Sequence, residues 1–277
     1  MNRWVTLSAN QQGDYAFMLP ISAMCWRKIA KYEPMALLTE TREHWDNPTG
    51  RVVLDMIARM EIRKHFIGVV KEPYRTSVQA QAARQHAASH KMYPADDYVL
   101  TADVDMLPLA EHWFNKQDWS KDVHIWYANA WSNCGGWFTT GYIGARVGTW
   151  REFMKYEPCG EIAPILEAAL ERHLTPERDT WQEWFFDENY TSARLKAWSG
   201  YPDRVQFMER TGRPPSDRLD RSNWGSGLDG KVDAHALRPA NSAENWPKMF
   251  HFFKAILGDS AMEYIDGYYK RYMAVKA

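Results

Sequence analysis

The fold is decided by residues 98–108, which read Tyr-Val-Leu-Thr-Ala-Asp-Val-Asp-Met-Leu-Pro. The first five of these residues are apolar or β-prone and predict a buried strand over 98–102. Two carboxylates one residue apart follow, and Pro108 ends the extended run. Ligands of open α/β sheets bind at the carboxyl ends of the strands. Because alternate side chains of an extended chain point to the same side, Asp103 and Asp105 can converge on one cation.

The two carboxylates offer the hard oxygen ligands that Mg²⁺ and Mn²⁺ prefer. Such ions commonly bridge protein carboxylates to substrate phosphates and stabilise a departing nucleoside diphosphate as Lewis acids. A D-x-D pattern also arises by chance, and the alternative is a pair of solvated carboxylates at a strand end. We expect the metal site because the pattern follows the fourth strand of a β–α series.

Upstream of this stretch, strand and helix patterns alternate. Strands are expected over residues 4–9, 35–39 and 65–70, and helices over 15–32, 52–64 and 76–92. Strand and helix in this rhythm imply crossover units. The sequence therefore predicts an α/β fold with a mixed, mainly parallel sheet flanked by helices.

Downstream, the pattern changes. Strands are expected over 123–130 and 137–145, and Thr180, with Glu183 three residues on, predicts a capped helix that runs to about residue 198. Residues 201–241 are rich in Pro, Gly, Asp, Arg and Ser, which is typical of a long functional loop. Helices are expected over 246–257 and in the tail.

We therefore expect one domain, with its catalytic core in residues 1–200. Residues 201–277 would add a loop or lid and closing helices to the same domain.

Composition narrows the class of protein. A formal net charge of -1 over 277 residues gives no basic field, which makes a nucleic-acid acceptor an unfavoured expectation. The start of the chain has no signal-peptide pattern, and no run approaches the about 18 apolar residues of a membrane span. The 3 cysteines are odd in number and lack metal-type spacing. We expect a cytoplasmic protein with reduced thiols and no membrane span.

The D-x-D stretch resembles the signature of GT-A glycosyltransferases, the nucleotide-diphospho-sugar transferases. Residues 6–10 (Thr-Leu-Ser-Ala-Asn), followed by Tyr15, resemble the first, nucleoside-binding strand of that family. Residues 138–144 (Phe-Thr-Thr-Gly-Tyr-Ile-Gly) are similar to its acceptor-side strand, and 187–189 (Asp-Glu-Asn) to its acidic motif. Residues 250–254 (Phe-His-Phe-Phe-Lys) look like the late histidine segment that completes the metal shell. The resemblance covers about residues 4–254 and implies a GT-A-like fold with a Rossmann-like nucleotide-binding half and a loop-rich C-terminal region.

The resemblance also implies roles for individual residues. The implied donor-binding residues are Ser8, Ala9, Asn10, Tyr15, Arg84, Asp103, Gly141 and Lys254. The implied ligands of Mn²⁺ or Mg²⁺ are Asp103, Asp105 and His251. Asp187 and Glu188 are the implied catalytic or acceptor-binding pair.

Helix geometry bears separately on that pair. The apolar positions of the expected helix form one stripe: Trp181, Trp184, Phe185, Leu195 and Trp198. Glu188 falls inside this stripe, whereas Asp187 lies beside its edge. Desolvation on an apolar face raises a carboxyl pKa toward that of a useful general base. Geometry thus favours Glu188 as the base and the family motif favours Asp187, and both remain open.

Several other residues have both a functional and a structural interpretation. His251 sits among phenylalanines, so a hydrogen-bonded core histidine competes with the ligand, and His235 is a weaker rival for that role. Arg84 is equally interpretable as part of a solvated helix face. The candidate sugar platforms are Trp131, Trp137 and Trp224, for which core packing is the commoner use. Acidic neighbours balance the arginines of residues 204–221, which predicts a solvated loop.

The predicted function is metal-dependent transfer of a sugar from a nucleoside-diphosphate sugar, with a UDP-sugar favoured, to a glycan or other hydroxyl acceptor. One alternative is a nucleotidyltransferase that makes nucleotide-sugars, although residues 10–14 are short and lack the basic residues of its phosphate loop. The other is a non-catalytic carbohydrate-binding module built from the tryptophans.

Overall fold

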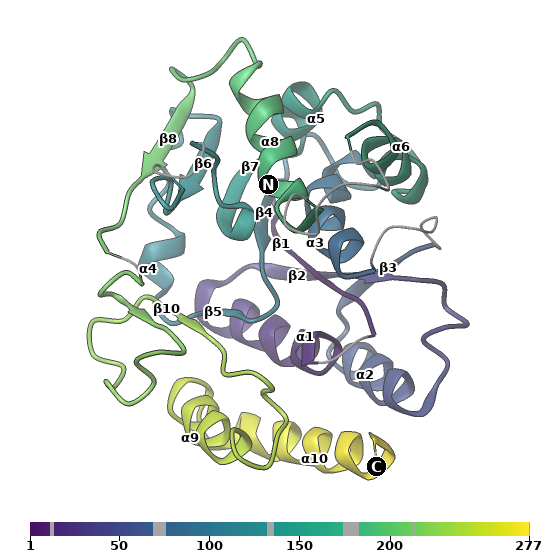
Figure 1. Ribbon diagram of the computed structural model, residues 1–277, viewed down its shortest axis with the longest axis vertical. Helices are drawn as coiled ribbons and strands as arrows, with labels where there is room; N and C mark the ends of the chain where they lie inside the picture. Colours follow the sequence, from purple (N-terminus) through teal and green to yellow (C-terminus); the bar gives the residue numbers. More distant parts are fainter. Residues whose placement is uncertain (12–13, 69–75, 132–135, 174–182, 213, 277) are drawn as a thin grey trace.

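A seven-stranded sheet runs through the centre of the molecule (Figure 1). The computed structural model describes residues 1–11, 14–68, 76–131, 136–173, 183–212 and 214–276. In spatial order the strands are β3 (Arg63–Ile67), β2 (Glu33–Thr39), β1 (Arg3–Ala9), β4 (Tyr98–Ala102), β7 (Ile143–Arg146), β6 (Val123–Trp126) and β8 (Val205–Met208).

Most of the strand pairs are parallel. β3, β2, β1 and β4 run parallel to one another, β7 is antiparallel to both β4 and β6, and β8 is parallel to β6. All five residues of β4 are buried, as expected of a strand covered on both faces. The mixed, mainly parallel sheet predicted from the sequence is confirmed.

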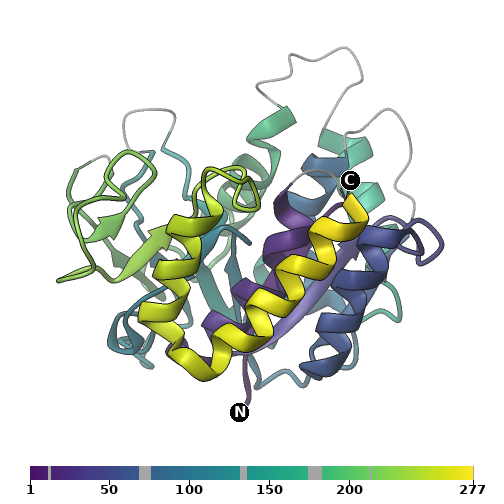
Figure 2. The ribbon, with the colours of Figure 1, turned by 90° about the horizontal axis from the view of Figure 1, so that it is seen from below.

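Helices cover both faces of the sheet (Figures 1 and 2). One face carries α1 (Asp14–Cys25), α2 (Pro48–Arg59), α9 (Trp246–Leu257) and α10 (Asp259–Lys276). The other carries α3 (Thr76–His86), α5 (Val147–Met154), α6 (Ala163–His173) and α8 (Phe186–Lys196). Short helical turns complete the set: η1 (Trp26–Ala30), η2 (Ala87–Ser89), α4 (Glu111–Phe114) and η3 (Thr140–Tyr142).

Successive residues of β1 face the two layers in turn, with Val5 and Leu7 packed in the first and Trp4 in the second. Within the described ranges no helix combines the length and the apolar character needed to cross a membrane.

A second, small sheet brings the C-terminal part of the chain to the D-x-D stretch. It has the order β5 (Met106–Pro108), β10 (Asp233–His235) and β9 (Arg218–Leu219). β10 pairs antiparallel with β5, so His235 lies opposite Met106. Residues 201–241 therefore hold three strands, including β8 of the central sheet, and the expectation of a long unstructured loop is wrong. Strands of two to four residues are too short for periodicity to reveal.

Buried ion pairs hold the small sheet together. Asp233 is inaccessible to solvent and accepts hydrogen bonds from Arg210 Nη2 at 3.0 Å and Arg218 Nη2 at 2.7 Å. A buried carboxylate is tolerated only when cations and hydrogen bonds surround it. The interpretation of residues 204–221 as a solvated arginine-rich loop is therefore wrong for these two arginines.

The expected strand over 137–145 is wrong in its first half. Thr101 Oγ1 donates to Thr140 O at 2.7 Å and accepts from Ile143 N at 3.0 Å, and this contact shapes residues 140–142 into the turn η3. β7 begins only at Ile143. The predicted N-cap Thr180 and Trp181 of the expected apolar stripe lie outside the described residues.

Gly144 is where β7 crosses the buried ring of Tyr98. A Cβ added at Gly144 would overlap the Tyr98 side chain, whose hydroxyl is 3.0 Å from His124 Nδ1. We predict that Gly144→Ala lowers the free energy of unfolding by about 2 kcal/mol, because overpacking a close-packed core costs about that much. Urea denaturation measures it. The control is Gly148→Ala, whose new Cβ would be an ordinary 3.5 Å from Ala95. Equal stabilities of the two variants would contradict the packing.

Candidate active site

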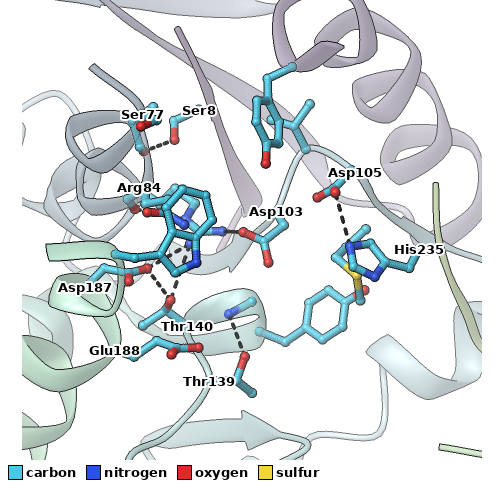
Figure 3. A pocket seen from close by; sticks show the side chains of 18 of the residues that line it. Ser8, Ser77, Arg84, Asp103, Asp105, Thr139, Thr140, Asp187, Glu188 and His235 are labelled. Carbon is cyan, nitrogen blue, oxygen red and sulfur yellow. Dashed lines mark hydrogen bonds and ion pairs between the residues drawn. The ribbon is translucent and has the colours of Figure 1, made fainter. Parts of the chain in front are cut away.

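A cavity of about 390 Å³ opens at the carboxyl ends of β1 and β4 (Figure 3). β1 and β4 are neighbouring parallel strands, so their ends meet at one edge of the sheet. The end of β1, α3, the D-x-D residues, η3, the start of α8 and the small sheet all contribute walls. This is where ligands bind in open α/β sheets.

Most of the site residues predicted from the sequence meet in this cavity. Those that line it are Ser8, Ala9, Asn10, Tyr15, Arg84, Asp103, Asp105, Gly141, Asp187 and Glu188. They come from segments more than 100 residues apart in the chain, such as Arg84 and Asp187. The structure brings them together around one cavity.

His251 and Lys254 lie elsewhere, on the exposed side of α9. His251 contacts Pro247 O through Nδ1 at 2.7 Å, and Lys254 pairs with Asp259 at 2.9 Å. Neither lines the cavity. The expectation that they join the donor and metal site is therefore corrected. Helix phase is the reason: Phe252 and Phe253 face the core, which turns His251 to the outside.

His235, the weaker rival in the sequence, lies beside Asp105. Its Nε2 is 3.1 Å from Asp105 Oδ2 (Figure 3). Its Nδ1 is 3.4 Å from Asp220 Oδ2. Burial disfavours its charged form, but the hydrogen bonds that it donates to both carboxylates raise the pKa of His235 overall. The pairing of β10 with β5 delivers this side chain to the cavity.

Asp105 is surrounded by cations. Its side chain is 5% exposed, and Oδ2 accepts hydrogen bonds from both Arg221 Nη2 and Arg238 Nη2 in addition to the contact with His235. Burial alone would raise the pKa of Asp105, but His235, Arg238 and Arg221 hold it well below its usual range.

Sequence reasoning missed Arg221 and Arg238. They lie 116 and 133 residues from Asp105 in the chain, so no local pattern links them to it.

Arg84 bridges two carboxylates on the opposite wall. Its Nη1 is hydrogen-bonded to Asp103 Oδ1, and its Nη2 donates to Asp187 Oδ2 at 2.9 Å (Figure 3). Arg84 is 3% exposed, which excludes the solvated helix face. Burial opposes its charge, but Asp103 and Asp187 raise the pKa of Arg84 above its usual value.

Asp187 is enclosed by donors. Besides Arg84, Oδ2 accepts from Gln85 Nε2 at 3.3 Å and from the hydroxyl of Thr140. Burial raises the pKa of Asp187, and Arg84 partly opposes that rise. Because Oδ2 already accepts hydrogen bonds from three donors, Asp187 is arranged to orient its neighbours rather than to accept a substrate proton.

Glu188 accepts fewer hydrogen bonds than Asp187. Oε1 accepts from Trp131 Nε1 at 3.0 Å, whereas Oε2 is buried without a hydrogen-bond partner in the described part of the chain. Burial, followed by the charge of Asp187, raises the pKa of Glu188 to about 8. A desolvated carboxyl group at a cavity, with one oxygen that lacks a hydrogen-bond partner, is suited to proton transfer.

Among the candidate sugar platforms, Trp131 lines the cavity. Trp137 is paired with Trp131 in an isolated bridge and does not line it. Trp224 packs on the Phe252 ring at 4.8 Å and donates to His235 O, so it supports β10.

The donor set suits a hard divalent cation. No three His, Cys, Asp or Glu side chains form a ready-made metal cluster among residues that the structure describes. Asp103 is 39% exposed, and the missing side chain of Gly141 leaves Oδ2 open, because a Cβ there would lie 3.2 Å from it. Mg²⁺ sites commonly use one or two carboxylates and complete the shell with substrate phosphates. The residues present therefore fit such an ion.

No family model matches the chain, and no curated protein matches its sequence. The fold is similar to those of solved glycosyltransferases. The apo structure of the bifunctional glycosyltransferase WbbM aligns with a TM-score of 0.50 at 12% identity, over 98% of this chain and 52% of WbbM. This comparison shows a shared fold, and the GT-A-like class expected from the sequence is confirmed.

Two further structures align less closely. The galactosyltransferase LgtC, in complex with donor and acceptor sugar analogs, has a TM-score of 0.47 at 14% identity, over 99% of this chain and 96% of LgtC. The glycosyltransferase GlyE of Streptococcus pneumoniae TIGR4 has a TM-score of 0.43 at 13% identity, over 76% of this chain and 45% of GlyE. The chain thus spans about half the length of GlyE and of WbbM.

Arg84 should be a large contributor to stability. We predict that Arg84→Gln lowers the free energy of unfolding by about 3 kcal/mol near pH 7, because it leaves Asp187 buried without a counter-charge. The loss should shrink as the pH falls, since burial raises the pKa of Asp187 and its protonated form tolerates burial. Urea denaturation at pH 5 and pH 8 measures both effects.

The control is Arg204→Gln, which breaks a half-exposed pair with Asp122 and should cost less than about 1 kcal/mol. Adding Asp187→Asn to Arg84→Gln should recover part of the loss. A loss that is the same in both arginine variants, or that grows as the pH falls, would contradict the buried bridge.

Proposed function

We propose that this protein is a glycosyltransferase that moves a sugar from a nucleoside-diphosphate sugar to a hydroxyl acceptor. The observation that carries the proposal is the composition of one cavity. Two D-x-D carboxylates and a cluster of cations lie near the strand ends, and Glu188 and Trp131 lie on the wall formed by α8 and its neighbours. The fold shared with WbbM supports the class of reaction, and the chemistry is argued from the residues of this chain.

The donor would lie along the end of β1. Ser8, Ala9, Asn10 and Tyr15 line this side of the cavity and would contact the nucleoside, with UDP-sugars favoured. Asn10 is buried and donates to Thr76 Oγ1 at 3.0 Å, so its amide is fixed before a ligand arrives. The diphosphate would then lie toward Asp103 and the arginines.

A Mn²⁺ or Mg²⁺ ion would be held by Asp103, Asp105 and His235. When bound, such an ion neutralises charge on the leaving diphosphate as a Lewis acid. His235 takes the place that the sequence resemblance gave to His251, because His235 is 3.1 Å from Asp105 and His251 is outside the cavity.

The acceptor would bind against Trp131 and Glu188. Wide aromatic faces suit the apolar face of a sugar ring, and the indole nitrogen of Trp131 fixes Glu188 Oε1. Oε2 would then take the proton of the acceptor hydroxyl. Asp187 acts as a positioning residue, since it holds Arg84 and Thr140 in place. A glycan is the favoured acceptor.

Neither alternative function gains support from the cavity. A carbohydrate-binding module would need tryptophans on the surface, but several are buried in the core, namely Trp26, Trp45, Trp126 and Trp150. A nucleotidyltransferase would need a basic loop directly after β1, where this chain supplies no Lys or Arg over residues 10–14.

The proposed metal site can be tested by comparing substitutions of His235, a proposed ligand, and His251, which serves as the control. We predict that Asp103→Asn lowers the Mn²⁺-dependent affinity for UDP by about 100-fold, and that His235→Ala lowers it by at least about tenfold, the loss of one ligand. His251→Ala should change it by less than about twofold. Calorimetric titration of UDP with and without Mn²⁺ measures these affinities, with melting temperatures as the folding control. Affinity independent of Mn²⁺ in the wild-type protein, or lost only in His251→Ala, would refute the assignment.

If Glu188 is the general base, turnover should increase with pH. Because Glu188 must lose its proton to act as a base and its pKa is raised to about 8, turnover should rise with pH and level off above about 8. Glu188→Gln should lower kcat by about 100-fold or more and abolish this rise. Asp187→Asn should lower kcat but keep the rise, as a positioning residue would.

Turnover of candidate UDP-sugars between pH 6 and pH 9, at saturating donor, measures both variants. A Glu188→Gln enzyme with near-normal kcat and an unchanged profile would show that Glu188 is not the base.

A further inference from the structure

Arg221 and Arg238 present their guanidinium groups to the cavity from the loops that follow β9 and β10. Both donate through Nη2 to the same oxygen, Asp105 Oδ2. Their side chains are 33% and 37% exposed, whereas the carboxylate that they share is 5% exposed. The cations thus lie between the buried carboxylate and the open space of the cavity.

These two arginines differ from their neighbours in how much of each guanidinium is used. Arg210 and Arg218 donate to Asp233 through two nitrogens each and are structural. Within the described ranges, Arg221 bonds Asp105 and, through Nε, Ala236 O at 2.8 Å, and Arg238 bonds Asp105. A guanidinium has five N–H donors, so each retains donors for a ligand.

Charge and position point to an anion of more than one negative charge. Arg221, Arg238 and His235 surround Asp105, and Asp220 pairs with His235, so the two permanently charged arginines exceed the one carboxylate that they share by one positive charge. Arg238 also lies over the Tyr15 ring, 4.4 Å from its centroid, at the proposed nucleoside end of the cavity. Planar guanidinium groups bind phosphate oxygens in pairs of hydrogen bonds.

We propose that Arg221 and Arg238 form a diphosphate subsite in which Asp105 serves as the internal counter-ion until a ligand binds. A nucleoside diphosphate would take over the guanidinium donors, and the protein would bind it with measurable affinity in the absence of any divalent ion. The proposal rests on the proposed function in taking the ligand to be a nucleoside diphosphate, and it names the residues that hold the diphosphate.

Asp105 competes with a bound diphosphate for the guanidinium groups of both arginines, so substituting it should change binding in two opposite ways. Removing the charge of Asp105 frees both arginines, so Asp105→Asn should bind a diphosphate more tightly without metal. The same substitution should weaken the Mn²⁺-dependent part of the affinity, because it removes a proposed ligand of the ion. Opposite changes from one substitution are not expected of a residue that only supports the fold.

The experiment is calorimetric titration of the full chain with UDP, and separately with inorganic pyrophosphate, in excess EDTA. Arg221→Gln and Arg238→Gln should each weaken binding of both probes by at least about tenfold, equivalent to about 1.4 kcal/mol. Arg238→Lys should recover part of the affinity, because it restores the charge but not the planar donors. The matched control is Arg27→Gln, since Arg27 is 32% exposed and pairs with Glu33 outside the cavity.

The outcomes separate this proposal from the proposed function. Tighter metal-free binding by Asp105→Asn, together with weaker binding by the arginine variants and an unchanged Arg27→Gln, supports the subsite. Wild-type protein that binds neither probe in EDTA but binds UDP with Mn²⁺ overturns the subsite and leaves the proposed function standing. Arginine variants that keep their melting temperature and bind both probes like wild type overturn it as well. Should Arg221→Gln or Arg238→Gln not fold, Arg238→Lys and Asp105→Asn carry the same test.

Discussion

The carboxylate of Asp105, buried at the carboxyl end of β4, must have cations around it. A charge removed from water is stable only when opposite charges and hydrogen bonds replace the solvent. Here the cations come from the loops after β9 and β10, more than 100 residues further along the chain. The pairing of β10 with β5 carries them there. One buried charge thus joins the C-terminal part of the chain to the central sheet and completes the wall of the cavity.

A second buried charge network faces the first. Arg84 on α3 joins Asp103 to Asp187 on α8, and Thr140 of η3 closes that network. Asp103 is the member that stays partly exposed, and Gly141 leaves it room. The cavity therefore lies between two charge networks. In one, Arg221 and Arg238 share the carboxylate of Asp105. In the other, Asp103 and Asp187 share the guanidinium of Arg84. That division suits a donor diphosphate on one side and a proton-accepting carboxylate on the other.

Local sequence patterns predicted the elements that are buried throughout or along one face. β4 could be predicted because all five of its residues are buried, which gives a continuous apolar or β-prone run, and α9 because its apolar positions repeat along one face. Strand-end geometry predicted the position of Asp103, whereas Arg84 and Asp187 were assigned to the same site only through the family resemblance. The position of His235 in the cavity and of His251 outside it could not be predicted, because the phase of α9 and the register of β10 against β5 are tertiary properties. The arginines at Asp105 were invisible for the same reason, since a contact across 116 residues leaves no local trace.

The central claim is that the D-x-D turn and the segment containing Arg221, His235 and Arg238 form one ligand site. Hydrogen–deuterium exchange with and without saturating UDP and Mn²⁺ tests it directly, because a shared ligand slows local opening on every element that it contacts. The account predicts slower exchange in peptides that cover residues 103–106 and, in the same experiment, in peptides that cover residues 218–238. Slower exchange in one of these two segments alone, or in neither while UDP is bound, would contradict it.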